Sequence, residues 1–428
     1  MNGVKDVIWY TCRMIGLLDC NNFFVSCERL FRPDLVHMPV LVLSSNDGCV
    51  VARSQEVKDL GISMGIPFFE IQSICKKEGI TVFSSNFTLY RDISRRVMQA
   101  LKAEYAVYEV YSIDEAFFEV SDQITTQELL EIRNRIIQKT GIPVSIGVAT
   151  TKTRAKIANR IAKKDHGVCI MDDVLWAQII PDMSCSSVWG IGRQTTSTLS
   201  KAHVHTVADF LALDPAYVKQ SFGIVGERLR LELLGEPVYR LLEGHAHEQQ
   251  SYTSTRSFGK STHDKSTLLS ALSYHIAQVA LKLRKDGMVT REVHIIMHGS
   301  RFGDFSHRES SFTLPLSLPT NNSLVLTKAV SQLLDMHFDP EIPYKKAGVL
   351  VSGIQPETMS TGDLFSSVIP SKEENLLDHV CDDLGKKFGT GVIRIGTSLY
   401  TRLWKEKSTY GSPSYTTQWA DICRVKAI

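Results

Sequence analysis

Two adjacent carboxylates, Asp114 and Glu115, interrupt a run of β-branched and aromatic residues at 107–120 (VYEVYSIDEAFFEV). Such residues favour strands, so the segment predicts a hairpin with the two acids at its tip. Successive side chains on a flat strand point to opposite faces, so the acids can share a site only where the turn breaks this alternation. Adjacent acids at a hairpin tip are often only solvated turn residues, but burying an unpaired carboxylate is costly. The apolar surroundings therefore favour a cation partner.

A third carboxylate stands at the end of another apolar run. Residues 14–20 (MIGLLDC) predict a buried strand that carries Asp19, and the two asparagines that follow are candidate N-caps of a helix. If this strand lies beside the hairpin, Asp19, Asp114 and Glu115 converge. Such carboxylates can hold two Mg²⁺ ions about 3.5–4 Å apart, which neutralise a triphosphate and activate a hydroxyl. Taken singly, an acid at a strand end is more often a helix cap or a loop residue.

The other strong patterns in the first 170 residues alternate between strand and helix. Strands are expected at 40–43 and 143–149, and helices at 127–139 and 151–164. A βα alternation with carboxylates at strand ends predicts an α/β-type arrangement for this part of the chain.

A second domain is expected beyond a candidate linker at 244–250. Residues 293–297 (VHIIM) predict a strand, and 267–285 and 323–337 predict helices, which together indicate a separate α+β domain. Past residue 355 the periodicity is weak until 377–388, a texture typical of a flexible extension.

The helix expected at 151–164 is strongly basic. Lys152, Lys156 and Lys163 fall on one side of it, and the segment contains no acid. A solvated face is the usual fate of such charges, although mixed signs would serve solubility better. A phosphate partner, either a triphosphate or a DNA backbone, is the better explanation.

Two shorter features also bear on function. Gly190 and Gly192 lie in a predicted tight turn before a helix, a spacing typical of a helix-hairpin-helix whose backbone N–H groups can hold a DNA phosphate. Phe23 and Phe24 follow Asp19 closely. Spacing alone favours helix core for them, and the alternative is a floor under a nucleotide sugar that excludes a 2′-hydroxyl.

Composition excludes several classes of protein. The net charge of +2 is too small to identify a nucleic-acid binder, and the nine cysteines lack zinc-ligand spacing. With no membrane-length apolar run and no signal-peptide pattern, a cytoplasmic protein is expected. The first thirteen residues are of uncertain status because Met14 opens the first strong pattern and is an alternative start.

Several motifs, in this order, resemble the Y-family of translesion DNA polymerases. The resemblance rests on DCNNFFVSCERLFRPDL at 19–35, SSNDGCVVARSQEVKDLGISMG at 44–65, FSSNFTLYRDIS at 83–94, YSIDEAF at 111–117, TKTRAKIANRIAKK at 151–164, VWGIGR at 188–193 and SPSYTTQWADICRVK at 412–426. The last motif is similar to the UmuC-type branch of the family.

The resemblance implies a role for particular residues. The three carboxylates would be the catalytic, metal-binding acids for two Mg²⁺ ions, with the carbonyl of Cys20 as a further ligand, and Phe24 would be the steric gate. The nucleotide would be bound by Phe23, Phe24, Arg53, Lys58 and Lys163. The DNA would be bound by Lys152, Lys156, Gly190, Gly192 and Arg193.

The resemblance also implies an α+β, right-hand polymerase with an α/β-type palm. The expected parts are an N-terminal extension at 1–13, a palm at 14–24 and 84–180, small fingers at 25–83, a helical thumb with the helix-hairpin-helix at 181–244, an α+β little finger at 246–354 and a C-terminal tail at 355–428.

The implied activity is template-directed, error-prone translesion synthesis in the SOS response, on primed template DNA with deoxynucleoside triphosphates. The implied partners are a UmuD′ dimer and a RecA filament, docked through the tail, and a sliding clamp. Of the clamp-binding peptide only Leu364 and Phe365 are retained. Location in the cytoplasm, with association to the nucleoid during activity, follows from the same resemblance.

Two rival functions remain open. A nucleotide cyclase also places acids on a palm hairpin, but it needs neither a helix-hairpin-helix nor a downstream α+β domain. A noncatalytic DNA-binding regulator on the same scaffold would not need its acids, and all three are present here.

Overall fold

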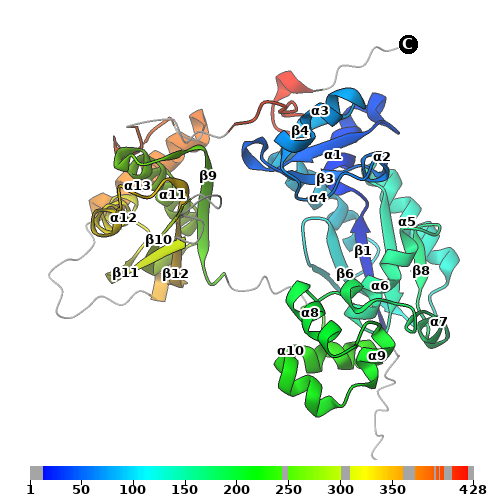
Figure 1. The fold of residues 1–428 in the computed structure, drawn as a ribbon. Helices are drawn as coiled ribbons and strands as arrows, with labels where there is room; N and C mark the ends of the chain where they lie inside the picture. The colour runs from blue at the N-terminus through cyan, green and yellow to red at the C-terminus, as the bar shows by residue number, and fades with distance from the viewer. Residues whose placement is uncertain are drawn as a thin grey trace, which may run out of the picture. The chain divides into compact units, whose positions relative to one another are not determined.

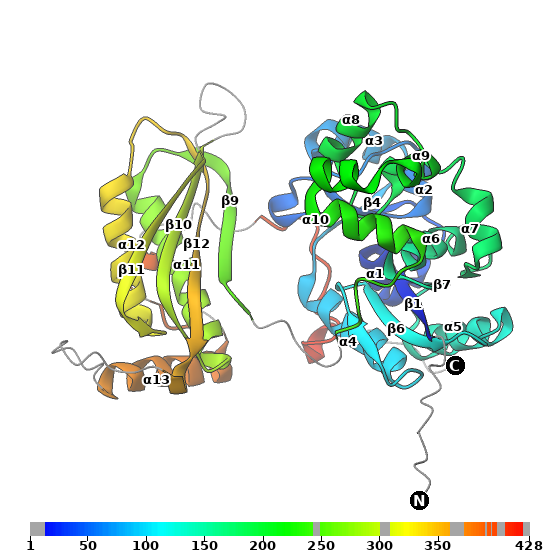
Figure 2. The same cartoon turned by 90° about the horizontal axis from the view of Figure 1, so that it is seen from below.

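The computed structural model describes residues 13–242, 249–299, 309–359, 372–389, 392–394, 396–399 and 407–422. The chain forms two units, one made of residues 1–245 with 410–428 and the other of residues 246–409 (Figures 1 and 2). The division falls within the expected linker at 244–250. Within the described ranges, no helix is both long and apolar enough to cross a membrane.

A five-stranded sheet in the order β5-β6-β1-β7-β8 organises the first unit. Its strands are β1 Arg13–Cys20, β5 Tyr108–Val110, β6 Glu115–Ser121, β7 Val144–Ala149 and β8 Val168–Ile170. Helices α1 Phe23–Phe31, α4 Phe87–Lys102 and α5 Thr126–Thr140 share one hydrophobic core with the sheet, and α6 Lys152–Ala162 shares another. The expected hairpin, strands and helices of this region are confirmed.

The helix α6 packs unusually close to the sheet. At Gly147 of β7 a Cβ atom would lie only 2.1 Å from the backbone nitrogen of Asn159. The Asn159 side chain also donates hydrogen bonds to the carbonyl oxygens of Leu17 (3.1 Å) and Ser145 (2.8 Å). The absence of a side chain at Gly147 and these bonds hold α6 against the end of β1 where Asp19 lies.

A three-stranded sheet in the order β3-β2-β4 lies between α1 and α4 in the sequence. Its elements are β2 Val40–Leu43, β3 Val50–Arg53, α2 Gln55–Asp59, α3 Phe68–Lys77 and β4 Thr81–Ser84. These elements bury a small core of their own, and this agrees with the compact segment that the sequence predicts here.

The rest of the first unit before the linker is helical. It contains α7 Asp173–Ile179, η3 Cys185–Ser187, α8 Arg193–Lys201, α9 Val207–Ala212 and α10 Pro215–Leu234. Its apolar residues share a core with α6 and with Leu17 and Phe117 of the large sheet. The glycine turn lies just before α8, but the element before that turn is the single 3₁₀ turn η3 rather than an α-helix.

The second unit is an antiparallel sheet in the order β11-β10-β12-β9. Its elements are β9 Tyr252–Thr262, α11 Lys265–Lys285, β10 Met288–Gly299, β11 Glu309–Thr320, α12 Ser323–His337, β12 Tyr344–Pro356 and α13 Lys372–Phe388. The helices α11 and α12 contribute buried side chains to one core with the sheet, which confirms the expected α+β domain.

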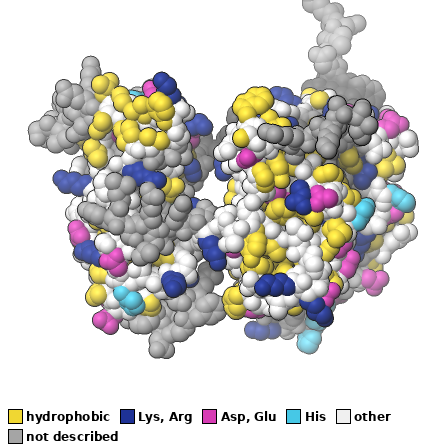
Figure 3. Space-filling model, turned by 90° about the horizontal axis from the view of Figure 1, so that it is seen from above, with side chains coloured by type: hydrophobic (Ala, Val, Ile, Leu, Met, Phe, Trp, Pro, Cys, Tyr) yellow, Lys and Arg dark blue, Asp and Glu magenta, His cyan; other side chains and the backbone are white. Residues whose placement is uncertain are grey.

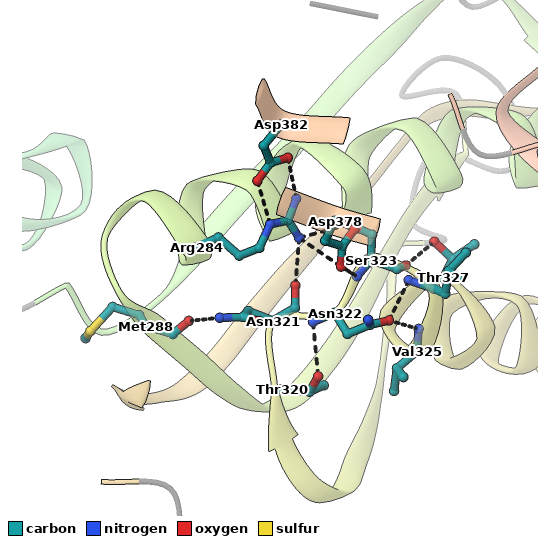
Figure 4. A network of polar contacts seen from close by, with 11 residues as sticks. Arg284, Met288, Thr320, Asn321, Asn322, Ser323, Val325, Thr327, Asp378 and Asp382 are labelled. Carbon is teal, nitrogen blue, oxygen red and sulfur yellow. Dashed lines mark hydrogen bonds and ion pairs between the residues drawn. The ribbon is translucent and has the colours of Figure 1, made fainter. Parts of the chain in front are cut away.

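Polar contacts centred on one buried arginine attach helix α13 to the rest of the second unit. Arg284 of α11 makes a two-point ion pair with Asp382 (2.7 and 2.8 Å) and contacts Asp378 (3.4 Å), both on α13 (Figure 4). It also donates to the backbone oxygen of Asn321 and to the hydroxyl of Ser323. A guanidinium with most of its donors used in this way fixes the helix firmly.

The end of the described chain returns to the first unit. We call residues 410–422 the C-terminal strap. The Tyr415 ring stacks on Phe31 with centroids 4.5 Å apart, and the backbone of Tyr410 pairs with that of Ser84 (3.0 Å). The expectation of a flexible extension past residue 355 is therefore wrong for α13 and for the strap, because both are held by contacts that the local sequence pattern does not show.

Candidate active site

Strand register brings two of the predicted acids together. Asp19 on β1 lies opposite Glu115, the first residue of β6. The N–H of Cys20 donates to the carbonyl oxygen of Asp114 (2.9 Å), so the backbone of the third acid adjoins the same strand end. As expected, Asp114 lies in the turn and Glu115 begins the strand, so the strand alternation does not separate them.

The side chain of Asp114 is turned toward its own loop. Its Oδ1 accepts a hydrogen bond from the Ser112 hydroxyl (2.6 Å), which in turn accepts the N–H of Glu115 (3.1 Å). Among the described residues, no three acidic, histidine or cysteine side chains form a ready-made metal cage. The pair Asp19 and Glu115 nevertheless fits a Mg²⁺ ion, which takes one or two carboxylates and fills its shell with water and phosphate oxygens.

Lysines from α6 and the residue after it neutralise this pair. Lys163 Nζ lies 2.7 Å from Asp19 Oδ1, and Lys156 Nζ lies 2.7 Å from Glu115 Oε2. Lys156 also lies over the rings of Tyr111 and Trp189, with its Nζ 4.5 and 5.3 Å from their centroids. These lysines stand at the carboxylates rather than on a free basic surface.

The expectation of an uncompensated basic helix is therefore wrong. Lys152 is buried, with Nζ 2.6 Å from Glu109 and 3.0 Å from the carbonyl oxygen of Arg240, so its ammonium is not presented to a DNA phosphate. Arg154 pairs with Asp173 in the same manner (2.9 Å). The compensating acids come from other elements, which is why the helix's own sequence contains none.

Asp19 is held in an environment that disfavours its charge. Burial, together with the neighbouring charge of Glu115, raises the pKa of Asp19 to about 6, and Lys163 acts in the opposite direction. Burial and the acids around it also raise the pKa of the Cys20 thiol. A buried pair of carboxylates that repel each other is stabilised by additional positive charge.

A cavity of about 320 Å³ opens at these groups. Its lining includes Asp19, Glu115, Lys156, Lys163 and Arg160. The cavity is thus acidic on the sheet side and basic on the helix side, an arrangement that suits a metal-bound polyphosphate.

Further cations stand beside the site. Lys58 Nζ donates to Asn22 Oδ1 (2.7 Å), and burial lowers the pKa of Lys58, with the charges of Arg53 and Lys163 acting in the same direction. Asn22 occupies the cap position of α1 in the left-handed region (φ 48°), but its side chain does not cap the helix. The predicted cap residue instead tethers a predicted nucleotide-binding lysine.

The two adjacent phenylalanines have different surroundings. Phe23 is buried in the core of the large sheet. Phe24 is only partly buried and stacks on Tyr90, with ring centroids 4.4 Å apart and planes at 14°, while Phe87 meets it edge-on at 5.9 Å. The structure thus favours core for Phe23 and leaves Phe24 available as the wall of a nucleotide pocket.

The predicted DNA contacts Gly190, Gly192 and Arg193 are not among the residues that line this cavity. Gly190 has a positive φ of 93°, and Gly192 precedes α8 without a side-chain cap, with open space where its Cβ would stand. Arg193 opens α8. On the face drawn in Figure 3, the described lysines and arginines are dispersed among acidic and uncharged side chains. Leu364 and Phe365 lie outside the described residues.

Sequence reasoning missed several groups that build the site. Asn159 and Ser145 hold α6 and β1 in place, and the Ser145 hydroxyl donates to Asn21 Oδ1 (3.0 Å). Arg160 lines the cavity. Of these residues, the sequence indicated only Arg160, as a further cation of the basic helix. Asn159 and Ser145 act through hydrogen bonds between distant elements, which leave no local pattern in the sequence.

Comparison with known proteins gives matches over nearly the whole chain. Residues 18–160 match the impB/mucB/samB family, and residues 249–364 match its C-terminal domain. The protein UmuC of Salmonella typhimurium is 34% identical over 96% of this chain and 100% of its own length. The chain belongs to the impB/mucB/samB family. MucB of Escherichia coli, another relative in this family, is 31% identical over 96% of the chain and 99% of its own length.

More distant relatives of this impB/mucB/samB protein carry another name. DNA polymerase IV 1 of Bacillus subtilis is 26% identical over 93% of the chain and 96% of its own length. Among solved structures, a Y-family DNA polymerase chimera superposes with a TM-score of 0.67 at 18% identity, covering 80% of this chain and 99% of that one. The expected UmuC-like, right-hand polymerase fold is confirmed. Residues 376–425, including most of α13 and the strap, match a domain of unknown function.

Proposed function

We propose that this chain is a DNA-directed DNA polymerase that copies damaged templates, with UmuC-like translesion synthesis as its role. The observation that carries the proposal is the pairing of Asp19 with Glu115 across β1 and β6, at a cavity whose other wall is basic. Relatives named UmuC and DNA polymerase IV, together with the Y-family fold, support the same activity.

The proposed catalytic groups are Asp19, Asp114 and Glu115, with the carbonyl of Cys20 as a further proposed metal ligand. Two Mg²⁺ ions bound there would neutralise the triphosphate and lower the pKa of the attacking 3′-hydroxyl. Asp114 can take part while its Oδ1 keeps the Ser112 hydroxyl, because an ionised carboxylate has further lone pairs for a metal. The side chains of Asp19 and Glu115 need only release their lysines.

The basic wall provides the proposed binding groups for the triphosphate. Lys163 would release Asp19, Lys58 would release Asn22, and both ammonium groups would then contact phosphate oxygens. Arg53 would add positive charge beside them. Lys156 would remain near Glu115. Phe24 would lie beneath the sugar and exclude a 2′-hydroxyl, while its stacking on Tyr90 fixes the ring.

DNA would be held mainly by groups outside the cavity. The uncapped N-terminus of α8, with Gly190, Gly192 and Arg193, is the proposed contact to a backbone phosphate. Lys152 is not included, because it is buried and paired. The UmuC resemblance further supports a UmuD′ dimer, a RecA filament and a sliding clamp as partners, and action on nucleoid DNA in the cytoplasm.

Primer extension tests the proposal against its rivals. The chain, with Mg²⁺, a primed template and deoxynucleoside triphosphates, should elongate the primer, and incubation with a free nucleotide alone should yield no cyclic product. Formation of a cyclic nucleotide would favour a cyclase. DNA binding without elongation in the presence of the accessory proteins would favour a noncatalytic regulator.

A further inference from the structure

The C-terminal strap has no role in the chemistry described so far, and it belongs to the part of the chain that matches a domain of unknown function. It nevertheless contacts the elements that carry Phe24. Its Ser412 hydroxyl donates to Glu28 Oε1 (3.0 Å) on α1, the helix on which Phe24 also stands.

Glu28 connects this contact to the aromatic that supports Phe24. The Tyr90 hydroxyl of α4 donates to the same Oε1 (2.7 Å), and the Tyr90 ring is the one that stacks on Phe24. Glu28 and Tyr90 are both fully buried. Glu28 Oε2 has no hydrogen-bond partner among the described residues, so the carboxyl depends on its two hydroxyl donors for satisfaction.

Ser412 also fixes the start of α4. Asn86 is the N-cap of that helix, and its Oδ1 accepts the N–H of Leu89 (3.1 Å). Its Nδ2 donates to the Ser412 hydroxyl (3.0 Å) and to the Pro413 carbonyl (3.2 Å). The strap therefore orients the capping amide, and α4 begins with Phe87, the second aromatic that touches Phe24.

The strap is itself held in place. Tyr415 stacks on Phe31 at the end of α1, and Tyr410 meets Phe68 edge-on with centroids 5.6 Å apart. Two hydrogen bonds join Tyr410 to Ser84, which lies just before the segment that leads into α4. The Ser84 N–H donates to the Tyr410 carbonyl oxygen (3.0 Å), and the Tyr410 N–H donates to the Ser84 hydroxyl (3.0 Å). Contacts on both sides of Ser412 thus hold its hydroxyl at Glu28.

We infer that the strap is a positioning element for the nucleotide site, in which Ser412 acts through Glu28 and Tyr90 to fix Phe24 and so sharpens the choice between deoxyribose and ribose. This inference rests on the proposed polymerase function. None of these three residues touches the reacting atoms. Their effect is to remove freedom from the ring that would lie beneath the sugar.

The test compares three variants of the full chain. Ser412→Ala removes the hydroxyl, and Ser412→Thr retains it. Ser414→Ala is the matched control, because the Ser414 side chain makes no hydrogen bond to the described residues, although its N–H bonds to Asp421 (2.8 Å). Steady-state insertion of dCTP and CTP opposite a template guanine gives kcat and KM for each sugar. Hydrogen–deuterium exchange of α1 and α4 gives a readout that needs no activity.

Ser412→Ala should reduce discrimination against CTP about fivefold, the factor that corresponds to one hydrogen bond. The weaker discrimination should appear as a higher KM for dCTP and as more insertion of CTP. The kcat for dCTP should stay within about twofold of the wild-type value because the reacting groups are untouched. The first turn of α4 should exchange faster. Ser412→Thr should restore both properties, and Ser414→Ala should change neither.

The outcomes separate the inference from the function on which it rests. Unchanged sugar discrimination in an otherwise active Ser412→Ala variant would overturn the positioning role and leave the polymerase intact. So would equal losses in all three variants, which would indicate a general disturbance. If wild type inserts no nucleotide, the polymerase proposal fails, and unchanged exchange in α1 and α4 would then overturn the structural role of the strap as well.

Discussion

Asp19 and Glu115 face each other across β1 and β6, and each is met on the other side by a lysine at 2.7 Å. The four charges form two ion pairs at the cavity wall. Two positive and two negative charges therefore balance at the site. Under the proposed function, metal ions would replace the lysines at the two carboxylates, and the released lysines would contact the phosphates of the bound triphosphate.

The first prediction concerns the carboxylates. Asp19→Ala and Asp114→Asn should each lower the rate of primer extension by about a thousandfold or more, since an effect of roughly 4 kcal/mol on the transition state is expected when a metal ligand is lost. Binding of primed DNA, measured by fluorescence anisotropy, should remain nearly unchanged because the acids serve the metals. Loss of DNA binding together with synthesis would indicate that the acids are structural.

The second prediction concerns the steric gate. Phe24→Ala should admit ribonucleotides, because removal of the ring opens space beneath the 2′ carbon. Insertion assays with matched deoxy- and ribonucleotides measure this directly. Phe23→Leu is the control, since Phe23 is buried in the core and should affect stability rather than sugar choice. Unchanged discrimination in Phe24→Ala would assign the gate to another residue.

The accuracy of sequence-based reasoning differed between local and long-range features. The helix expected at 323–337 is α12 with those same limits, and Asn322 caps it with hydrogen bonds to two backbone N–H groups. The first and last residues of a helix depend on residues that are close in the sequence. By contrast, Glu109 neutralises Lys152 from 43 positions away, and Ser412 bonds to Glu28 across 384 positions. No periodicity encodes contacts of that separation, which is why the expected free basic face and flexible tail differ from the structure.

The site itself divides in the same way. The acids could be placed because strands of strong pattern carry them, and the hairpin turn explains how Asp114 and Glu115 share one edge. The pairing of β1 with β6 could not be predicted, because the sequence alone does not show that the Asp19 strand lies beside the hairpin. The countercharges at Lys156 and Lys163 depended on the close approach of α6, which Gly147 permits.

The third prediction concerns stability and pH. Burial raises the pKa of Glu28 from 4.5 to about 7. A raised carboxyl pKa means that the folded state binds the Glu28 proton more tightly than the unfolded state does. The stabilisation of the folded state by this proton is complete below about pH 4.5 and is lost as the pH rises toward 7. Glu28→Gln retains an oxygen acceptor for Tyr90 and Ser412 but carries no charge to bury.

Glu28→Gln should therefore be more stable than wild type at pH 8, by up to roughly 3 kcal/mol on the scale of 1.36 kcal/mol per pKa unit. The difference should shrink as the pH falls from 7 to 5. Thermal unfolding of both proteins across this range measures it. A difference that does not vary with pH would show that Glu28 does not titrate in the folded state.

The fourth prediction concerns DNA binding and salt. The logarithm of the affinity for primed DNA should fall linearly with the logarithm of the salt concentration, because phosphate contacts release counterions. Arg193→Ala should reduce the slope by about one unit. Lys152→Gln is the control and should leave the slope unchanged, since Lys152 is buried against Glu109. A slope that changes in the Lys152 variant and not in the Arg193 variant would reverse the assignment.

The last prediction concerns the accessory proteins, and it follows from the UmuC resemblance. Weak synthesis by the isolated chain and strong stimulation by UmuD′ and RecA with ATP are expected. Removal of residues 356–428 should abolish the stimulation, but it would also remove α13 and the strap, both of which are packed against the rest of the chain. A single exposed residue gives a cleaner test.

Trp419 in the strap is 91% exposed, whereas Tyr415 in the same segment is stacked on Phe31. Exposed tryptophans are frequent anchors of protein interfaces, where truncation costs about 2 kcal/mol or more. Trp419→Ala should therefore raise the concentration of UmuD′ and RecA needed for half-maximal stimulation by about 30-fold. Basal synthesis and the melting temperature should not change, because the side chain supports little of the fold.

Phe69→Ala, at another exposed aromatic on α3, is the matched control. Equal stimulation of both variants would place the docking surface elsewhere, and equal loss in both would point to a general effect of surface aromatics.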